Sequence, residues 1–475
     1  MAPETKRRGD PILKALAKNL PRLTTKDPPL KRLIKGEAAT GLAERTAAVH
    51  ARRKGPLGLL QALGPGLITG ASDDDPSGIG TYSQVGSQFG YGLLWTALFT
   101  FPLMSAVQEL CARIALQTGT GLGTALRRKF PTWIVSIAVI ALCVANMINL
   151  GADLGAVAAG ASLLSVGHVS ASVFLLPIAA LILALQLFTS YSTIFRIFKY
   201  LTLALFAYVV TVFFVRPGVG AVITSTFIPR LELDPGFIAA LVAVLGTTIS
   251  PYLFFWQASS EVDEMKAAGQ RTVAERRNVT RDELRAARTD ILAGMGFSQV
   301  IMYCIILTTG TVLHAHGQTG VLTAQQAAQA LAPVAGQFAY ILFAAGLIGT
   351  GLLAIPILSG SAAYAIKELL GLHGSLAVRP RYRPTFYGVI VVATVVGLLF
   401  NLLRVDPIQM LFVTAMINGI VAPPLLALIV LLGSDRAVMR DKRSGRLSRW
   451  LTWIATGAMS AAALGLVLSP LLSRA

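Results

Sequence analysis

Three consecutive aspartates, Asp73 to Asp75, interrupt a stretch whose apolar character is otherwise that of a membrane-spanning helix. Pro76 follows them and removes one backbone donor, and Gly78 lowers the helix preference further, so carbonyl groups around residues 72–75 lose their helical partners. Free carbonyls at membrane depth are tolerated only where they are buried in protein or line a wet cavity. A bound cation would satisfy them, so the stretch predicts an ion site.

The charge of Asp75 indicates the same chemistry. A carboxylate near the bilayer centre costs about 2.5–3.5 kcal/mol on insertion scales, and no Lys or Arg lies in the middle of a predicted span to neutralise it. We therefore interpret Asp75 as a metal ligand whose positive partner is the transported substrate. Ser77 and Asp74 are further candidate metal ligands, and Gly78 leaves space for the ion. Asp73 and Asp74 are equally well explained as caps of a short re-entrant helix.

A second apolar stretch is interrupted by Thr-Thr-Ile-Ser-Pro at residues 247–251. Thr247, Ser250 and the carbonyls released by Pro251 are oxygen donors, so both hydroxyls are candidate metal ligands, directly or through water. The alternative is that each hydroxyl bonds the carbonyl four residues back, as hydroxyls in membrane helices often do.

Soft ligands are absent from both interruptions, which contain no methionine, cysteine or histidine. Carboxylate, hydroxyl, carbonyl and water oxygens suit Mg²⁺, Ca²⁺ and Mn²⁺, whereas thiolates and thioethers select thiophilic metals. Mg²⁺ sheds water reluctantly and usually keeps several waters beside one or two carboxylates. The two interruptions therefore predict a site for a hard, partly hydrated divalent cation.

The elements that must position these residues are membrane-spanning helices. The chain of 475 residues is 54% hydrophobic and only 13% charged, with a mean hydropathy of +0.65, whereas soluble domains average about 25% charged residues. Hydropathy predicts an all-α membrane protein with eleven transmembrane helices, near residues 57–88, 91–116, 131–155, 170–189, 197–216, 236–258, 290–313, 337–365, 384–403, 408–432 and 450–472.

The net charge of +18 follows this topology rather than a nucleic-acid surface. With a cytoplasmic N-terminus, all but four of the 41 Lys and Arg lie on the cytoplasmic side; the four are Arg216, Arg230, Arg404 and Arg474. Such one-sidedness predicts that the N-terminus is inside and the C-terminus outside, in the plasma (inner) membrane. The basic segments are expected to touch anionic lipid, and a nucleic-acid partner is excluded by the lack of any recognition motif.

The chain divides into a basic cytoplasmic arm, residues 1–55, expected to be largely disordered, and a transmembrane transporter domain, residues 56–475. The polar segment 259–290 is predicted to be a cytoplasmic helix. The interruptions fall in spans one and six, so the second lies in a helix that crosses the bilayer in the opposite direction. Paired interruptions in inverted halves are typical of transporters with discontinuous helices. The halves are 57–216 and 236–432, followed by an eleventh helix at 450–472.

Four motifs resemble one family. GPGLITGASDDDPSGIGTYSQVGSQFGYGLLW is similar to the first span and following loop of the NRAMP divalent-metal transporters, and QELCARIALQTGTGL, ANMINLGADLGAVAAGASLL and GTTISPYLFFWQAS resemble their spans two, three and six. The resemblance covers roughly residues 55–432. It implies a leucine-transporter-type fold of two inverted five-helix repeats plus one extra helix, with helices 1 and 6 discontinuous and with divalent cations moved by alternating access.

The chain departs from that family at the first break. Where the family usually reads Asp-Pro-Gly-Asn, this chain has Asp75 to Gly78 as Asp-Pro-Ser-Gly, so an asparagine ligand is lost. In span three the familiar aspartate is retained as Asp153, whereas a glutamate becomes Ala156. Asp153 and Glu109 are intramembrane acids that either line a polar route or are hydrogen-bonded inside the bundle, and we favour the hydrogen-bonded interpretation.

The second break departs further. The family pattern Ala-x-x-Met-Pro-His becomes Thr247, Ser250, Pro251 and Tyr252, so a hydroxyl replaces the thioether and a phenol replaces a histidine; a second family histidine is matched by Gln257. Tyrosine and glutamine do not titrate usefully near neutral pH, unlike histidine. The changes resemble the NRAMP-related magnesium transporters, which implies Mg²⁺ and Mn²⁺ transport without proton coupling.

We therefore predict a divalent-cation importer that favours Mg²⁺ and accepts Mn²⁺, in which the metal is substrate, no cofactor is needed and a monomer suffices. The rivals are a proton-coupled Mn²⁺/Fe²⁺ transporter of the ordinary family type and an organic-solute transporter of the same fold. An enzyme is not expected, because the sequence contains no nucleophile with an adjacent base, no phosphate-cradling loop and no zinc-ligand spacing. A transport-dead sensor is disfavoured because no sizeable soluble domain is evident.

Overall fold

The computed structural model describes residues 65–472, except for 166–167, 190–201, 278, 321–322, 373, 377, 379 and 404. The predicted arm, residues 1–55, lies outside the described residues. Within the described part the structure is helical and contains no strand. This agrees with the all-α prediction.

Seven segments are long and apolar enough to cross a membrane, and Phe206–Val215 and Pro384–Phe400 are shorter apolar helices. They cover most of the spans expected from hydropathy, while the total of eleven stays a prediction. The long helices and helix pairs are α5 (Pro65–Asp73) with α6 (Pro76–Phe89), α7 (Trp95–Thr118), α9 (Thr132–Leu164), α10 (Ala171–Phe188), α12 (Phe206–Val215), α14 (Pro235–Thr248) with α15 (Pro251–Ala267), α17 (Arg281–Val312), α20 (Ala339–Leu370), α21 (Pro384–Phe400), α22 (Pro407–Ser434) and α24 (Arg446–Leu472).

Short elements connect these helices. Five of the short elements whose bounds follow here form the two ends of the helix bundle, namely α8, α13, α16, α23 and η2. The short elements are α8 (Leu122–Lys129), η1 (Thr202–Leu205), α13 (Val219–Phe227), α16 (Val273–Arg276), η2 (His314–His316), α18 (Ala324–Gln329), α19 (Ala332–Ala335), η3 (Gly336–Phe338), η4 (Pro380–Tyr382), η5 (Asn401–Leu403), α23 (Arg436–Met439) and η6 (Arg440–Lys442).

Two pairs of helices meet at a proline. Helix α5 ends at Asp73 and α6 begins at Pro76, with Asp75 as the N-cap residue in extended conformation. Helix α14 ends at Thr248 and α15 begins at Pro251, with Ser250 as an extended N-cap residue. Proline suits the first position of a helix because its missing N–H would be unpaired there in any case. The local chemistry at each proline therefore ends one helix and starts the next.

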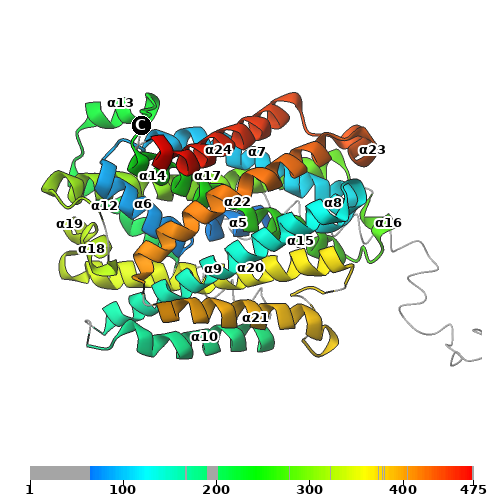
Figure 1. Ribbon diagram of the computed structural model, residues 1–475, viewed down its shortest axis with the longest axis horizontal. Helices are drawn as coiled ribbons and strands as arrows, with labels where there is room; N and C mark the ends of the chain where they lie inside the picture. Colours follow the sequence, from blue (N-terminus) through cyan, green and yellow to red (C-terminus); the bar gives the residue numbers. More distant parts are fainter. Residues whose placement is uncertain are drawn as a thin grey trace, which may run out of the picture. The chain divides into compact units, whose positions relative to one another are not determined.

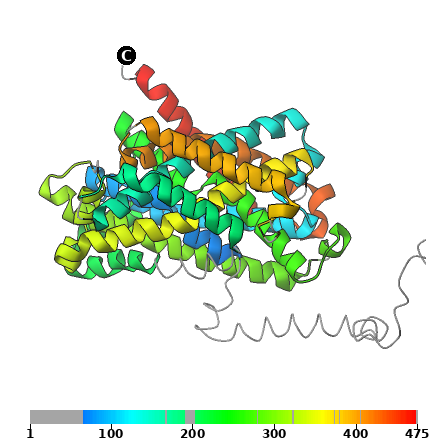
Figure 2. The same ribbon diagram turned by 90° about the horizontal axis from the view of Figure 1, so that it is seen from below.

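Small residues let the elements around these junctions approach closely. Helix α5 lies beside α17 (Figures 1 and 2), and a Cβ on Gly70 would come within 2.2 Å of the Gly294 backbone. Helix α14 packs on α22, where a Cβ on Gly246 would come within 2.1 Å of the Ala415 carbonyl. Because lipid removes the hydrophobic drive between helices, such close backbone packing is a main source of their association.

Helix α9 lies lengthwise beside α20, and α10 and α21 lie along them (Figure 1). Pro76, the first residue of α6, reaches this group, because a Cβ on Gly351 of α20 would come within 3.3 Å of the proline ring. The junction between α5 and α6 is therefore enclosed by α9, α17 and α20 and is shielded from solvent.

The segments predicted to be cytoplasmic meet at one end of the bundle, called here the basic end, which carries α8, α16 and α23. Glu368 accepts a hydrogen bond from the Gly123 amide at 2.8 Å, Lys129 forms an ion pair with Asp435, and the Arg276 guanidinium donates to the Gly119 carbonyl at 2.9 Å. The opposite end carries the turn Gly90–Gly92, α13 and η2.

The expectation of one cytoplasmic helix over 259–290 is wrong. Helix α15 continues to Ala267, the chain turns at Gly269 with φ +97°, and the short α16 follows. Helix α17 then begins at Arg281. Thr272 and Thr280 each start a helix through a reciprocal capping box with the glutamate three residues on. Local capping therefore divides a segment whose composition favours helix throughout.

Candidate metal site

The Asp75 side chain caps the helix that it precedes. Its Oδ1 atom accepts hydrogen bonds from the Gly78 amide at 2.8 Å and from the Ser77 hydroxyl at 2.6 Å. The residue is 1% exposed, and it forms no ion pair with any Lys or Arg that the structure describes. The cap role expected for Asp73 or Asp74 thus belongs to Asp75, because Asp75 is the residue directly before Pro76.

The second carboxylate oxygen of Asp75 faces two other helices. Asn149 of α9 donates from Nδ2 to Asp75 Oδ2 at 3.2 Å, and the Tyr252 hydroxyl of α15 lies 3.3 Å from the same oxygen. The phenol also lies 2.9 Å from the Ser72 carbonyl. A phenol has one proton, and the shorter contact to the carbonyl takes it. Asp75 Oδ2 therefore keeps unused acceptor capacity.

Thr247 lies beside the first break. Its Oγ1 is 3.2 Å from Ser77 Oγ, although the two residues are 170 positions apart in sequence. A Cβ on Gly78 would lie 3.5 Å from Thr247 Oγ1 and 3.4 Å from the Asp73 carbonyl oxygen. The structure thus brings Asp75, Ser77, Gly78 and Thr247 together, and any side chain at position 78 would occupy the space between them.

Ser250 lies at the start of α15 but its hydroxyl is engaged locally. It contacts the carbonyl of Gly246 at 3.2 Å and that of Thr247. This matches the alternative in which the hydroxyl bonds backward along the chain. In this conformation Ser250 therefore makes no hydrogen bond to the Asp75 group.

Asp73 and Asp74 face α17. The Ser298 hydroxyl lies 2.7 Å from Asp73 Oδ2 and 3.1 Å from Asp74 Oδ1. The other oxygen of each carboxyl group is buried without a hydrogen-bond partner. Asp74, a candidate ligand from the sequence, is thus held with Asp73 by Ser298 and shares no hydrogen-bonding group with Asp75.

Glu109 and Asp153, the two intramembrane acids expected to be hydrogen-bonded, differ in their bonding partners. Glu109 forms an ion pair with Arg113 and accepts from the Ser444 and Ser448 hydroxyls at 3.2 and 3.0 Å, so the expectation is confirmed for Glu109. Asp153 is fully buried and neither of its carboxyl oxygens has a hydrogen-bond partner. The groups that act electrostatically on the Asp153 carboxyl are Asp75, a like charge, and the Ser77 backbone amide, a weak hydrogen-bond donor. The expectation therefore stays a prediction for Asp153.

Sequence reasoning missed Asn149, Tyr252 and Ser298 as neighbours of the three aspartates. A signal existed for Asn149, because Asn146, Asn149 and Asp153 recur at helical spacing and place three polar groups on one face of an apolar helix. No comparable pattern marks Ser298, which is one hydroxyl in a long helix. Asn149 Oδ1 is buried without a partner, so this amide has an oxygen available to a ligand.

The donor set at the first break is hard and oxygen-based. No group of three or more His, Cys, Asp or Glu side chains able to hold a metal occurs among the described residues, so an ion bound here takes most of its ligands from hydroxyls, amides, carbonyls or water. Such oxygens suit Mg²⁺ and Mn²⁺. Thr247 and Asp75 are both buried, so the ion reaches them only if the helices move.

A family model described as natural resistance-associated macrophage protein-like (Nramp) matches residues 66–469. The divalent metal cation transporter MntH of Deinococcus radiodurans is 25% identical over 432 residues, which are 90% of this chain and 93% of that protein. MntH of Xanthomonas campestris pv. campestris is 30% identical over 306 residues, which are 62% of this chain and 65% of that protein.

Two solved structures show the same fold. A manganese transporter of Eremococcus coleocola, solved with an aromatic bis-isothiourea substituted compound, has a TM-score of 0.66 and 17% identity over 88% of this chain and 92% of that chain. Mhp1, a nucleobase-cation-symport-1 family transporter in a closed conformation, has a TM-score of 0.53 and 16% identity over 87% of this chain and 92% of that chain. At these identities the similarity concerns the fold alone.

Proposed function

This chain belongs to the natural resistance-associated macrophage protein-like family, and from this membership we propose that it transports divalent metal cations across a membrane by alternating access. The observation that carries the proposal is Asp75: a buried carboxylate at a helix junction, surrounded by neutral oxygen donors and paired with no described Lys or Arg. A charge so placed is costly unless a cation neutralises it. The transported ion is that cation, and it is cargo rather than a cofactor.

The preferred substrate in this proposal is Mg²⁺, with Mn²⁺ accepted. Asp75 is the charged ligand, and Thr247, Ser77 and the amide oxygen of Asn149 are neutral donors. Gly78 maintains space for a water, and Ser250 acts through water because its hydroxyl is engaged locally. Asp74 is a peripheral charge held by Ser298. The lack of sulfur and imidazole among these groups supports a hard ion that stays partly hydrated.

Transport in this proposal is not coupled to protons. Tyr252 donates to the Ser72 carbonyl. Gln257 accepts from the Thr69 hydroxyl at 2.5 Å and donates to Glu261 at 2.9 Å. Both residues thus serve in fixed hydrogen bonds and offer no group that changes charge near neutral pH. The membrane potential then drives import, at about 2.3 kcal/mol per elementary charge per 100 mV. These features support the proposal that the chain belongs to the NRAMP-related magnesium branch.

The proposed architecture has eleven spans in two inverted repeats, 57–216 and 236–432, plus a last helix. Helices α5 with α6, and α14 with α15, are the discontinuous first and sixth spans. The clustering of α8, α16 and α23 at one end supports a cytoplasmic basic end in the plasma membrane, because positive residues are retained inside. With the ion site on the α6 and α15 junctions, a relative tilt of the helices would expose the site to one end at a time.

A flux assay tests the proposal. Purified full-length chain in liposomes is given Mg²⁺, Mn²⁺, Cd²⁺ or Ca²⁺ outside, with a metal indicator and a pH-sensitive dye inside. We expect Mg²⁺ and Mn²⁺ uptake without acidification and weak Cd²⁺ uptake, because no thioether is present. Cd²⁺ uptake exceeding Mg²⁺, together with acidification, would instead identify a proton-coupled transporter of the ordinary type. Absence of any metal flux would reject the proposal.

A further inference from the structure

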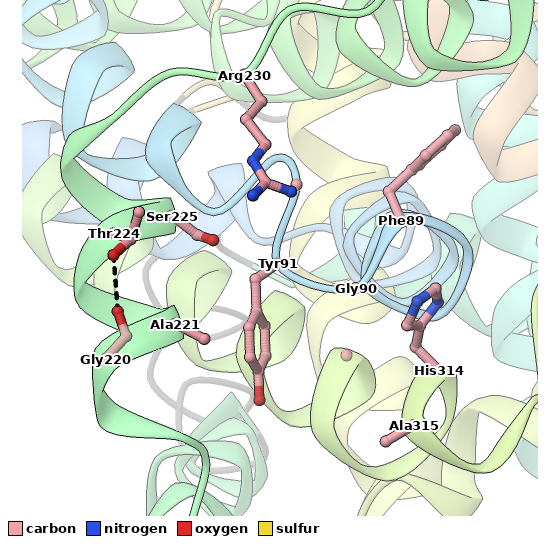
Figure 3. A pocket seen from close by; sticks show the side chains of 12 residues that line it. Phe89, Gly90, Tyr91, Gly220, Ala221, Thr224, Ser225, Arg230, His314 and Ala315 are labelled. Atoms are coloured by element: carbon pink, nitrogen blue, oxygen red, sulfur yellow. Dashed lines mark hydrogen bonds between the residues drawn. The ribbon is translucent and has the colours of Figure 1, made fainter.

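A cavity of about 480 Å³ lies at the end of the bundle opposite the basic end (Figure 3). Its walls are one face of α13, the turn Gly90–Gly92 that joins α6 to α7, and the end of α17 with η2. Arg230 and His314 bring nitrogen groups to it, and Thr224 and Ser225 bring hydroxyls. None of its lining residues is acidic, so the cavity is electrically positive.

The two nitrogen-bearing side chains are held differently. His314 is fixed, because its Nδ1 lies 2.8 Å from the Ser87 carbonyl; a carbonyl only accepts, so Nδ1 carries the proton and the ring is oriented by α6. Arg230 extends along the cavity toward the turn at Tyr91 (Figure 3), and no ion pair involving it occurs in the described part of the chain. Arg230 thus supplies an uncompensated positive charge.

Exposed apolar side chains lie on α13 and the segment after it, beside the residues that line the cavity but not among them. Val219, Ile223 and Phe227 recur every four residues along α13, so they form a stripe on one face, and each is more than half exposed. Ile228 and Leu231, on either side of Arg230, are 59% and 70% exposed. A helix with an exposed apolar stripe and a small, polar opposite face is typical of a helix lying in a membrane interface. Arginine at such a boundary extends its guanidinium toward the headgroup level.

We propose that this cavity binds the phosphate headgroup of an anionic phospholipid, with the acyl chains lying against the α13 stripe. Arginine matches phosphate because its planar guanidinium donates two parallel hydrogen bonds, and the Ser225 hydroxyl offers a further donor. The Thr224 hydroxyl already donates to the Gly220 carbonyl at 2.9 Å (Figure 3). A free phosphate would use the same donors but leave the stripe uncovered. The phospholipid accounts for both the unpaired cation and the exposed apolar residues.

The position of the cavity gives the bound lipid a second effect. Gly90–Gly92 forms its wall, and this turn follows directly on α6, the helix that Asp75 begins. A headgroup bridging Arg230 and the turn ties α13 to the end of α6. Any motion of α6 then has to preserve or break this bridge, so the lipid would change the rate of transport without touching the ion.

Native mass spectrometry of the full-length chain tests the site. The chain is mixed with phosphatidylglycerol or with phosphatidylcholine, and the lipid retained on each is counted. The variant Arg230→Gln removes the charge, and Arg216→Gln is a matched control because Arg216 is also an exposed arginine at this end but does not line the cavity. We expect Arg230→Gln to retain phosphatidylglycerol about five- to tenfold more weakly, Arg216→Gln to match the unchanged chain, and Arg230→Lys to recover part of the difference.

Three results would overturn the inference: equal retention of phosphatidylglycerol by Arg230→Gln and the unchanged chain, equal retention of phosphatidylcholine, or displacement of phosphatidylglycerol by millimolar inorganic phosphate, which would show that the headgroup alone is recognised. Metal flux through the Asp75 site does not enter these measurements, so the lipid site and the proposed transport function fail or stand separately.

Discussion

Three carboxylates near the basic end and Asp75 at the first break have different partners in the same fold. At the basic end, Glu109 is paired with Arg113, Asp435 with Lys129 and Asp263 with Lys266. At the break, Asp75 is buried among hydroxyls, an amide and a phenol, with no described cation beside it. Burial makes an unpaired charge more costly. Asp75 is the more buried carboxylate and would be expected to have a cationic partner, but none of the described Lys and Arg pairs with it.

This difference in charge pairing fits separate roles for the two regions. A charge paired within the protein stabilises a fixed arrangement, whereas in the proposed function the unpaired charge of Asp75 binds the transported cation transiently. Removal of the Asp75 charge is therefore expected to affect transport most, removal of a neutral donor less, and removal of an ordinary ion pair least.

The largest effect is expected for Asp75→Asn. Asparagine keeps an oxygen that can accept the Gly78 amide bond but removes the charge, so Mg²⁺ uptake into liposomes should fall about a hundredfold. Asp234→Asn is the control, because Asp234 also precedes a proline and caps its helix through the Phe237 amide at 3.1 Å, but is exposed. If the two variants transport alike, Asp75 acts only as a helix cap.

Thr247→Val should have the next largest effect. The valine keeps the shape but loses the hydroxyl that lies beside Ser77, and one lost neutral donor corresponds to a rise in KM for Mg²⁺ of up to about tenfold. Thr248→Val serves as the control, because the Thr248 hydroxyl donates to the Val244 carbonyl at 2.6 Å. An equal rise in KM for both variants would mean that the loss reflects helix packing and not the ion.

A smaller effect is expected for Asn149→Leu. The amide orients Asp75 Oδ2 from a different helix, so its loss should reduce Mg²⁺ uptake about fivefold while leaving the protein folded. Asn146→Leu, whose amide donates to the Leu358 carbonyl at 3.3 Å, changes the same helix one turn earlier. The role of Asn149 is rejected if uptake by both variants falls to the same extent.

The smallest effect is expected for Asp435→Asn at the basic end. The hydrogen bond from Lys129 lowers the pKa of Asp435 below its usual value. A lowered pKa contributes stability above the unfolded pKa of about 4, and this contribution is lost as the pH falls through the folded pKa. At pH 7 the variant should unfold at a slightly lower temperature, by about 0.2–1 kcal/mol in stability, with no change in Mg²⁺ uptake.

A thermal unfolding series from pH 7 to pH 3 checks this sign. The difference between Asp435→Asn and the unchanged chain should shrink toward the acid end. A difference that grows on acidification would mean that the ion pair does not set the stability of this contact.

Local chemistry made much of the fold predictable. Hydropathy summed over about twenty residues locates helices such as α9, α20 and α22, because each must carry enough apolar side chains to face lipid. The junctions at Pro76 and Pro251 were predictable for the same reason, since proline acts on the turn immediately before it. The charged ligand candidate also came from local evidence, through the absence of any Lys or Arg in the middle of a predicted span.

Contacts between distant segments were not predictable in this way. Asn149 reaches Asp75 across 74 positions, Tyr252 across 177, and Ser298 reaches Asp73 across 225. Each depends on which face of a helix is turned inward and on how closely glycine lets helices approach. A helix in which nearly all residues are apolar does not show from its sequence which of its faces turns inward.

Neighbouring residues along the chain thus specify a bundle of apolar helices with a charged interruption marked by proline, because hydrophobic transfer and helix breaking are local properties. The packing of distant helices was needed to show that Asn149 reaches Asp75, that Thr247 lies beside Ser77, and that Asp73 and Asp74 turn toward Ser298. The physical reason is that a hydrogen bond requires a donor and an acceptor within about 3 Å, and packing alone places groups from different helices so close together.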